Sequence, residues 1–190
     1  MDTKKEQILK AAGNIFAKFG LKKTTMDEIA KIARMGKSTI YYYFKSKESI
    51  FAEVIDKESR ILKQELSEAI AKATSPQQKI KNYMLTRMKH LKKLINYNTS
   101  LTDDYLSHYS FVENARKDFT QYEIHAIKDI LINGIDQNIF AIEDASAVAV
   151  IIVNGIKALE HILFIEKLSE NIEKEIDLIL NIIFKGIEKR

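Results

Sequence analysis

Residues that break helices are almost missing from this sequence. Proline occurs once and glycine six times among 190 residues, and both residues destabilise the interior of a helix. The apolar run VAVIIV at residues 148–153 could by periodicity alone be a buried strand. Its long context with few helix breakers indicates a helix instead. We therefore expect an all-α protein.

The composition bounds the class of protein further. Apolar residues make up 46% and charged residues 29%, which is typical of globular chains. Cysteine is absent, which excludes disulfides, thiolate metal sites and a catalytic thiol. The most apolar window, residues 145–156, meets Lys157 well before the ~20 apolar residues of a membrane span. The N-terminus is charged at once, unlike a secretory signal, so we expect a cytoplasmic protein with no membrane partner.

Positive charge is concentrated at the N-terminus. Residues 1–50 hold 11 Lys and Arg against 5 Asp and Glu, whereas the other 140 hold 19 against 21. A basic head on a mildly acidic body favours a polyanionic partner for the head. A solvated lysine-rich face would give the same balance, so charge alone leaves both interpretations open.

Helix signals follow one another along the chain. Thr25 to Glu28 form a capping-box pattern, and Ser75 followed by Pro76 has the form of a helix start. Gly20 stands where a C-terminal cap belongs, and Ser46 and Ser169 are candidate N-caps. About nine helices are expected, over residues 8–19, 25–33, 37–44, 46–73, 76–97, 102–108, 112–133, 145–166 and 169–188.

The third expected helix, GKSTIYYYF from residue 36, has two faces. At 3.6 residues per turn, Ile40 and Phe44 fall on one side with Tyr43 leaning toward them. The outward side chains all donate hydrogen bonds and none is acidic: Lys37, Ser38, Thr39, Tyr41 and Tyr42. Such groups can bind phosphates and base edges in a major groove. Alternatively, the tyrosines could serve only as packing residues of a small domain.

Two short helices joined by a tight turn, the second exposed and basic, indicate a helix-turn-helix. A further cation, Lys47, stands in the first turn of the next helix, where it opposes the helix dipole by ~0.3–1 kcal/mol. A phosphate docked at that helix N-terminus would explain the charge.

The segment TTMDEIAKIARMGKSTIYYYFKSKESIF, residues 24–51, resembles the DNA-binding segment of the tetracycline-repressor-like (TetR) transcriptional regulators. The resemblance implies phosphate contacts for Thr25, Tyr41, Tyr42 and Lys47, and base or phosphate contacts for Lys37, Ser38 and Thr39. Two positions depart from the family pattern. Arg34 replaces the usual turn glycine and is a further candidate for a phosphate contact, and Gly36 replaces a serine or threonine cap.

The same resemblance implies a division into a helix-turn-helix domain, residues 1–46, and a ligand-binding and dimerisation domain, residues 47–190. A homodimer would bind a near-palindromic operator in double-stranded DNA. A lipophilic or amphipathic small-molecule effector in the body would shift the helix over 46–73 and change the separation of the recognition helices. The expected protein is thus a repressor.

The candidate effector-binding and dimer residues in residues 47–190 lie on apolar helical faces that could equally form the hydrophobic core of a single chain. The candidate effector-binding residues are Tyr83, Met84, Arg87, Met88, Tyr105, Tyr109, Phe119 and Tyr122, with Arg87 able to pair an acidic head group. The candidate dimer residues are Ile152, Ile156, Leu159, Leu163, Ile172, Ile176, Ile179 and Ile183.

Two other classes of protein compete with a regulator. A helical di-iron enzyme needs Glu-x-x-His pairs, and none occurs. Glycine-rich phosphate loops and nucleophile motifs are also missing, so we expect no catalytic residue, metal or cofactor. A helical adaptor whose basic head binds an acidic partner remains open on sequence alone.

Overall fold

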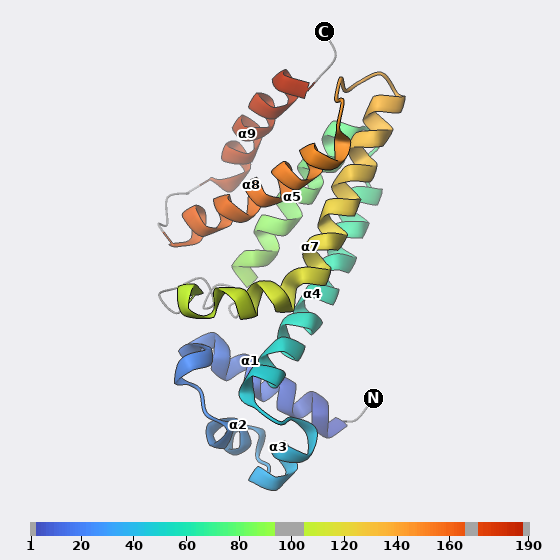
Figure 1. The fold of residues 1–190 in the computed structure, drawn as a ribbon. Helices are drawn as coiled ribbons and strands as arrows, with labels where there is room; N and C mark the ends of the chain where they lie inside the picture. The colour runs from blue at the N-terminus through green and yellow to red at the C-terminus, as the bar shows by residue number, and fades with distance from the viewer. Residues whose placement is uncertain (1–2, 94–104, 166–170, 188–190) are drawn as a thin grey trace. The chain divides into compact units, whose positions relative to one another are not determined.

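The computed structural model describes residues 3–93, 105–165 and 171–187. All the regular elements in these ranges are helices (Figure 1), as expected. They are α1 (Thr3–Lys23), α2 (Met26–Ala33), α3 (Lys37–Tyr43), α4 (Lys47–Ala71), α5 (Pro76–Lys93), α7 (Tyr105–Asp136), α8 (Ala145–Ile165) and α9 (Ile172–Ile187). Within the described ranges, no helix is long and apolar enough to cross a membrane.

One expected boundary is wrong. The predicted helices over 102–108 and 112–133 belong to one helix, because α7 continues without interruption from Tyr105 to Asp136. No glycine or proline separates the two predicted segments, so nothing in the backbone forces the helix to end there. Residues 102–104 lie outside the described ranges.

The chain forms two compact units. The first comprises Met1–Arg60 and Leu91–Arg116, and the second comprises Ile61–His90 and Lys117–Arg190. Three helices, α4, α5 and α7, therefore contribute residues to both units. The division expected at residue 46 remains a sequence-based prediction.

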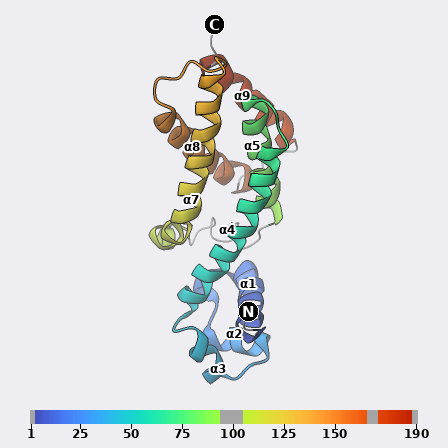
Figure 2. The ribbon, with the colours of Figure 1, turned by 90° about the vertical axis from the view of Figure 1, so that its right-hand side faces the viewer.

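The first unit has its own hydrophobic core. Helices α1, α2 and α3 gather around the N-terminal part of α4 (Figure 2). The rings of Phe16 on α1 and Phe51 on α4 meet edge to face, with centroids 5.3 Å apart, a favoured aromatic geometry. The other buried members of this core are Ile8, Leu9, Ala12, Ile15, Ile29, Ala30, Ile40, Phe44, Ile50, Val54 and Ile55.

The N-caps of the second unit follow the sequence signals in part. Ser75 accepts a hydrogen bond from the Gln78 amide at 3.2 Å, as its pattern predicts. Asp144 caps α8 by accepting bonds from two amides, at 2.9 and 3.0 Å. The predicted cap of the last helix, Ser169, lies outside the described residues. In the structure Asn171 accepts a bond from the Lys174 amide at 3.2 Å, so Asn171 caps α9.

The connection between α7 and α8 approaches the backbone of α7 closely. The amides of Ile139 and Phe140 donate to the carbonyl of Gly134 at 2.9 and 3.1 Å. A Cβ atom placed on Gly134 would lie 2.2 Å from Cδ2 of Phe140. The Phe140 ring also stacks on Phe184 of α9, with centroids 6.2 Å apart. The connection is therefore packed against two helices of the second unit.

Candidate DNA-binding surface

The turn between α2 and α3 is built on a residue that rarely adopts its conformation. Arg34 has φ 55° and ψ 42°, in the left-handed region, where a side chain other than glycine is strained. The Met35 amide donates to the Ala30 carbonyl at 3.0 Å, as in a helix end closed by a left-handed residue. Arginine thus takes the conformation that the family pattern assigns to glycine.

Helix α3 begins without a side-chain cap. Gly36 is the N-cap, and its carbonyl accepts from the amides of Thr39 and Ile40 at 3.0 and 3.3 Å. Glycine is an acceptable N-cap because its extended backbone allows the first helical bonds to form. The α2–turn–α3 pair therefore has helix-turn-helix geometry despite both departures from the family pattern.

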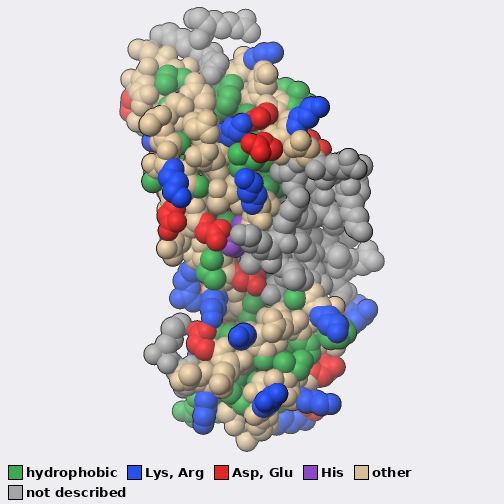
Figure 3. Space-filling model, turned by 180° about the vertical axis from the view of Figure 1, so that it is seen from behind, with side chains coloured by type: hydrophobic (Ala, Val, Ile, Leu, Met, Phe, Trp, Pro, Cys, Tyr) green, Lys and Arg blue, Asp and Glu red, His purple; other side chains and the backbone are tan. Residues whose placement is uncertain are grey.

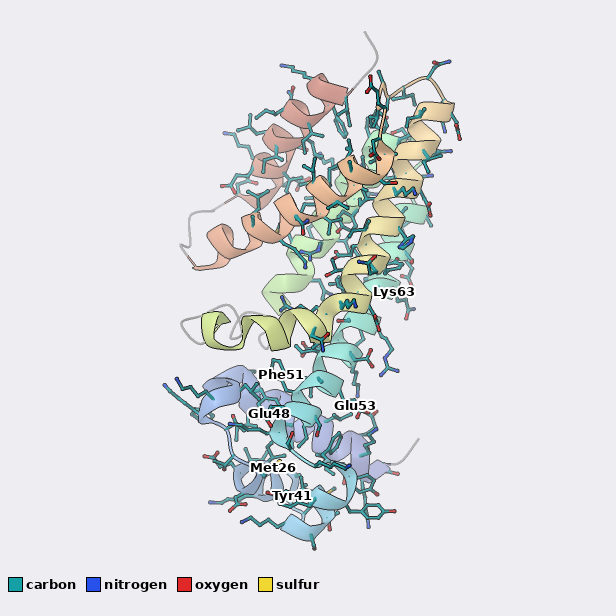
Figure 4. The ribbon with its side chains drawn as sticks, in the orientation of Figure 1. Met26, Tyr41, Glu48, Phe51, Glu53 and Lys63 are labelled. Carbon is teal, nitrogen blue, oxygen red and sulfur yellow. The ribbon has the colours of Figure 1, made fainter. Side chains whose placement is uncertain are left out.

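The side chains of α3 divide as their spacing predicts. Ile40 is 1% exposed and Phe44 4%, and Tyr43 packs half-buried against the same core. Tyr41 is 51% and Tyr42 83% exposed (Figure 4 labels Tyr41). Lys37 and Ser38 are also exposed, and Thr39 is half-buried. An exposed face that donates hydrogen bonds and lacks acidic groups is suited to nucleic acid.

The charge of this surface is positive. On the face drawn in Figure 3, Lys and Arg side chains are spread over the unit that carries α2 and α3. Lys37 pairs with Asp27 of α2 at 2.6 Å, and both side chains are more than half exposed. An exposed pair of this kind is worth about 1 kcal/mol at most, so it holds Lys37 weakly. Sequence reasoning did not identify Asp27 as the partner of Lys37.

Thr25 begins α2 in a complete capping box. Its hydroxyl and its amide each lie 2.8 Å from Oε2 of Glu28 and donate to it, and the Glu28 amide donates back to the hydroxyl at 3.3 Å. Hydrogen bonds from the Thr25 side chain, then from its backbone, lower the pKa of Glu28 below its usual 4.5, with a smaller contribution from the charge of Lys47. Thr25 is exposed at the start of α2, and its predicted phosphate contact stays a prediction.

Lys47 makes contacts that sequence reasoning missed. Its Nζ donates to the carbonyls of Leu21, Lys22 and Thr24 at 2.9, 3.1 and 3.0 Å. These acceptors stand more than twenty residues earlier in the chain, so the pattern around Lys47 gives no signal for them. The phosphate contact assigned to Lys47 from the resemblance stays a prediction.

In the second unit, Arg87 already has an acidic partner. Nε of Arg87 donates to Oε1 of Glu123, and Nη2 donates to Oε2 at 3.2 Å, with both side chains fully buried. The Tyr83 hydroxyl donates to the same carboxylate at 2.6 Å. Buried ions need such pairing to offset desolvation. The acidic group that Arg87 meets in the structure is thus a side chain of this protein.

The other candidate effector residues are only partly brought together. Met84 and Met88 on α5 and Phe119 on α7 are buried. Tyr122 is half-buried, and its hydroxyl bonds Ser67 of α4 at 2.7 Å. Tyr105 and Tyr109 lie outside the residues whose side chains are described.

The candidate dimer residues divide into three groups. Ile152, Ile156 and Ile176 are buried within the chain, and Leu159, Ile179 and Ile183 are half-buried. Leu163 and Ile172 lie outside the residues whose side chains are described. Among the side chains described on these helices, the large apolar ones that are exposed are Val150, Ile151, Leu178 and Ile182. Two of them, Ile151 and Ile182, line an apolar groove of about 400 Å³ between α8 and α9.

Helix α2, the turn and α3 together define a DNA-binding protein of the helix-turn-helix class. Residues 8–54 match the family model described as "Bacterial regulatory proteins, tetR family". This part of the chain therefore matches the TetR family of transcriptional regulators.

Two curated relatives show how far the similarity extends. The chain is 46% identical over 67 residues to the HTH-type transcriptional regulator YhgD of Bacillus subtilis, a match that covers 35% of each chain. It is 26% identical to the HTH-type transcriptional regulator QacR of Staphylococcus aureus over 97% of its own length and 98% of that protein. Both relatives are described as HTH-type transcriptional regulators.

Solved structures share the whole fold. A transcriptional regulator from Cytophaga hutchinsonii is 27% identical, with a TM-score of 0.77 and coverage of 99% of this chain and 100% of that one. A Clostridium perfringens regulator assigned to fatty acid metabolism is 28% identical, with a TM-score of 0.72 and coverage of 97% and 100%. FadR of Bacillus subtilis, solved with stearoyl-CoA, has the same fold at 20% identity, with a TM-score of 0.78 and coverage of 96% and 98%.

Proposed function

We propose that this protein is a ligand-responsive repressor that binds a near-palindromic operator as a homodimer and releases it when a small effector binds. The observation that carries the proposal is the two-sided helix α3. Ile40 and Phe44 fix it to the core of the first unit, while Tyr41, Tyr42 and Lys37 project from the opposite side. A helix held in this way can enter a major groove with its exposed side chains directed at DNA.

The dimer is supported by apolar surface on α8 and α9. Ile151, Leu178 and Ile182 are each more than 60% exposed, which is unfavourable for such large apolar side chains in water. A second copy covering them would give a two-fold dimer, the form in which helix-turn-helix proteins bind two adjacent half-sites. The exposed positions are better candidates for this interface than the buried Ile152, Ile156 and Ile176.

A lipophilic or amphipathic effector is supported by the apolar side chains of α5 and α7. Met84, Met88 and Phe119 are buried there beside the Arg87–Glu123 pair, and mostly apolar walls with a few polar groups are typical of small-molecule sites. The assignment of the Clostridium perfringens regulator to fatty acid metabolism supports the same effector class. We propose acyl compounds as the first ligands to test.

Selection of DNA from a random-sequence duplex library tests the central claim. We expect the wild-type protein to enrich a near-palindromic sequence and to protect it in a footprint. Tyr42→Ala should weaken binding to the selected duplex at least about tenfold, because a phosphate or base contact is lost. Its thermal unfolding should stay close to that of wild type, since Tyr42 is 83% exposed.

Phe19→Ala is the matched control, because it removes another exposed aromatic ring, on α1, from the same unit. It should bind the selected duplex like wild type. Enrichment of no sequence, together with tight binding to acidic proteins, would instead support the helical adaptor. Equal binding by Tyr42→Ala and wild type would show that α3 is not the DNA-reading element.

A further inference from the structure

The Nζ atom of Lys47 has a complete set of acceptors inside the protein. It donates to the carbonyls of Leu21, Lys22 and Thr24, at 2.9, 3.1 and 3.0 Å. A lysine ammonium carries three N–H donors and no acceptor. Three carbonyls around it therefore account for every donor, and a phosphate could be bound only by giving up one of these bonds.

The electrostatics of the two helix ends favour this arrangement. Lys47 is the first residue of α4, where a positive charge meets the positive end of the helix dipole. Leu21 and Lys22 lie after the kink at Gly20, in the short segment that ends α1, and their carbonyl oxygens carry the negative partial charge that attracts the ammonium. One ammonium thus binds the carbonyls at the end of α1 and offsets its own unfavourable position in α4.

The acceptors are themselves fixed in place. Thr24 is fully buried, and its hydroxyl donates to the Gly20 carbonyl at 2.7 Å. Gly20 has φ 77° and ψ 168°, which ends the regular part of α1 in a conformation open almost only to glycine. Thr24 is followed directly by Thr25, the N-cap of α2. A bond to the Thr24 carbonyl therefore holds the start of α2.

We propose that Lys47 is a positioning residue for DNA binding: its ammonium fixes the start of α2, and through it the turn and α3, to the first turn of α4. It does not itself neutralise a DNA phosphate. A displacement of the first turn of α4 is carried to α2 through these three bonds. The inference rests on the proposed DNA-binding function, and it assigns Lys47 a role different from the phosphate contact that the family resemblance implies.

Two variants separate positioning from phosphate binding. Lys47→Met removes the charge and all three donors, whereas Lys47→Arg keeps the charge but replaces the compact ammonium with a planar fork that cannot serve three converging carbonyls. We expect both to weaken binding to the library-selected duplex by about tenfold or more, the order expected for lost bonds to a charged group. Lys45→Met, which removes the same charge from an exposed position two residues away, should bind more tightly than either.

The salt dependence of binding gives the decisive comparison. A lost phosphate contact lowers the slope of log K against log salt by about 0.9. For a positioning residue, the slope of Lys47→Met should change no more than that of Lys45→Met. The proposal is overturned if Lys47→Arg binds like wild type while Lys47→Met loses about 0.9 in slope, or if Lys47→Met binds like wild type.

Hydrogen exchange tests the inference without DNA. The amides of Glu28 and Ile29 bond to Thr25 in the first turn of α2, and we expect both to exchange about tenfold faster in each Lys47 variant. The Lys79 amide, bonded to the Ser75 carbonyl in the second unit, is the reference. Unchanged exchange at Glu28 and Ile29 would overturn the proposal. A wild-type protein that enriches no DNA sequence would contradict the proposed function instead.

Discussion

At the scale of single residues, the turn of the helix-turn-helix contains a built-in strain. Arg34 is held at φ 55°, a conformation that is unfavourable by about 1–2 kcal/mol for a residue with a Cβ atom. Glycine adopts it freely but loses more conformational entropy on folding. We therefore expect Arg34→Gly to raise the free energy of unfolding by up to about 1 kcal/mol, measured by urea unfolding with an unchanged m-value.

Arg34→Ala separates the backbone from the charge. Alanine keeps the Cβ atom and hence the strain, so its free energy of unfolding should stay below that of Arg34→Gly. If Arg34 also contacts a phosphate, both variants should lose DNA affinity equally. A less stable glycine variant would show that the arginine side chain outweighs the strain of its backbone.

The capping box of α2 makes a pH-dependent contribution to stability. The pKa of Glu28 is lowered by hydrogen bonds from Thr25, so the folded protein favours the ionised carboxylate. The stabilisation is therefore fully present above the unfolded pKa of 4.5 and is lost as the pH falls through the lower folded value. We expect wild type to exceed Glu28→Gln in thermal stability near neutral pH and to converge with it in acid.

Glu143→Gln, which removes an exposed carboxylate before α8, serves as the control for general charge effects. Its melting temperature should follow that of wild type more closely than Glu28→Gln does near neutral pH. A constant difference between wild type and Glu28→Gln across the acid range would contradict the capping role.

The hydrogen-bond partners of Lys47 could not be predicted from the sequence, whereas the buried side of α3 could. The spacing of Ile40, Tyr42 and Phe44 predicts which side chains are buried, because that information is local to one helix. The positive charge at the start of α4 was also recognised, but its partners were not. They are backbone carbonyls, which have no sequence signature. Arg87 and Glu123 are likewise 36 residues apart, and nothing local connects them.

At the level of helices and their connections, Phe140 lies so close to the backbone of Gly134 that position 134 requires a residue without a side chain. A Cβ atom there would lie 2.2 Å from Phe140, a separation that requires the ring or the connection to shift. We expect Gly134→Ala to destabilise the protein by about 1–3 kcal/mol, as overpacking does, despite the higher helix propensity of alanine. The measurement is the free energy of unfolding in urea.

Gly186→Ala is the matched control in α9, where a Cβ atom would meet nothing within 4 Å. Its free energy of unfolding should lie within about 0.5 kcal/mol of wild type or above it. Equal effects of the two substitutions would contradict a steric role for Gly134.

Element boundaries were predictable where a side chain marks them. Thr25, Ser75 and Asp144 precede helices that begin as expected, because N-caps are chemically distinctive. The division of α7 into two helices was wrong, since it relied on a change in pattern without a breaker. The start of α9 was placed at Ser169, whereas Asn171 is the observed cap; both residue types are good caps, so type alone does not choose between them.

At the scale of the whole molecule, the exposed apolar residues of α8 and α9 should determine the oligomeric state. We expect wild type to be a dimer in sedimentation equilibrium and the double variant Ile151→Glu/Ile182→Glu to be monomeric at the same concentrations. Four charges in a two-fold interface would be desolvated on association. The monomer should bind one half-site weakly and lose most of its affinity for the full operator.

Ile61→Glu places a charge at another exposed isoleucine, on α4, and should leave the dimer intact. A double variant that stays dimeric would move the interface elsewhere on the protein. The sequence indicates that these two helices are unusually apolar, but it could not separate their inward from their outward face. Ile152 and Ile156 differ from Ile151 in burial only through the packing of other helices around α8.

The first unit is discontinuous along the chain, since it comprises Met1–Arg60 and Leu91–Arg116. Ala115 packs against the core that α1 to α4 form. During synthesis on the ribosome, the first unit therefore has its full set of packing partners only after residue 116 has left the exit tunnel. A shortened protein that stops at residue 60 would expose the surface that Ala115 covers. The smallest fragment expected to reproduce the native first unit therefore extends through Arg116.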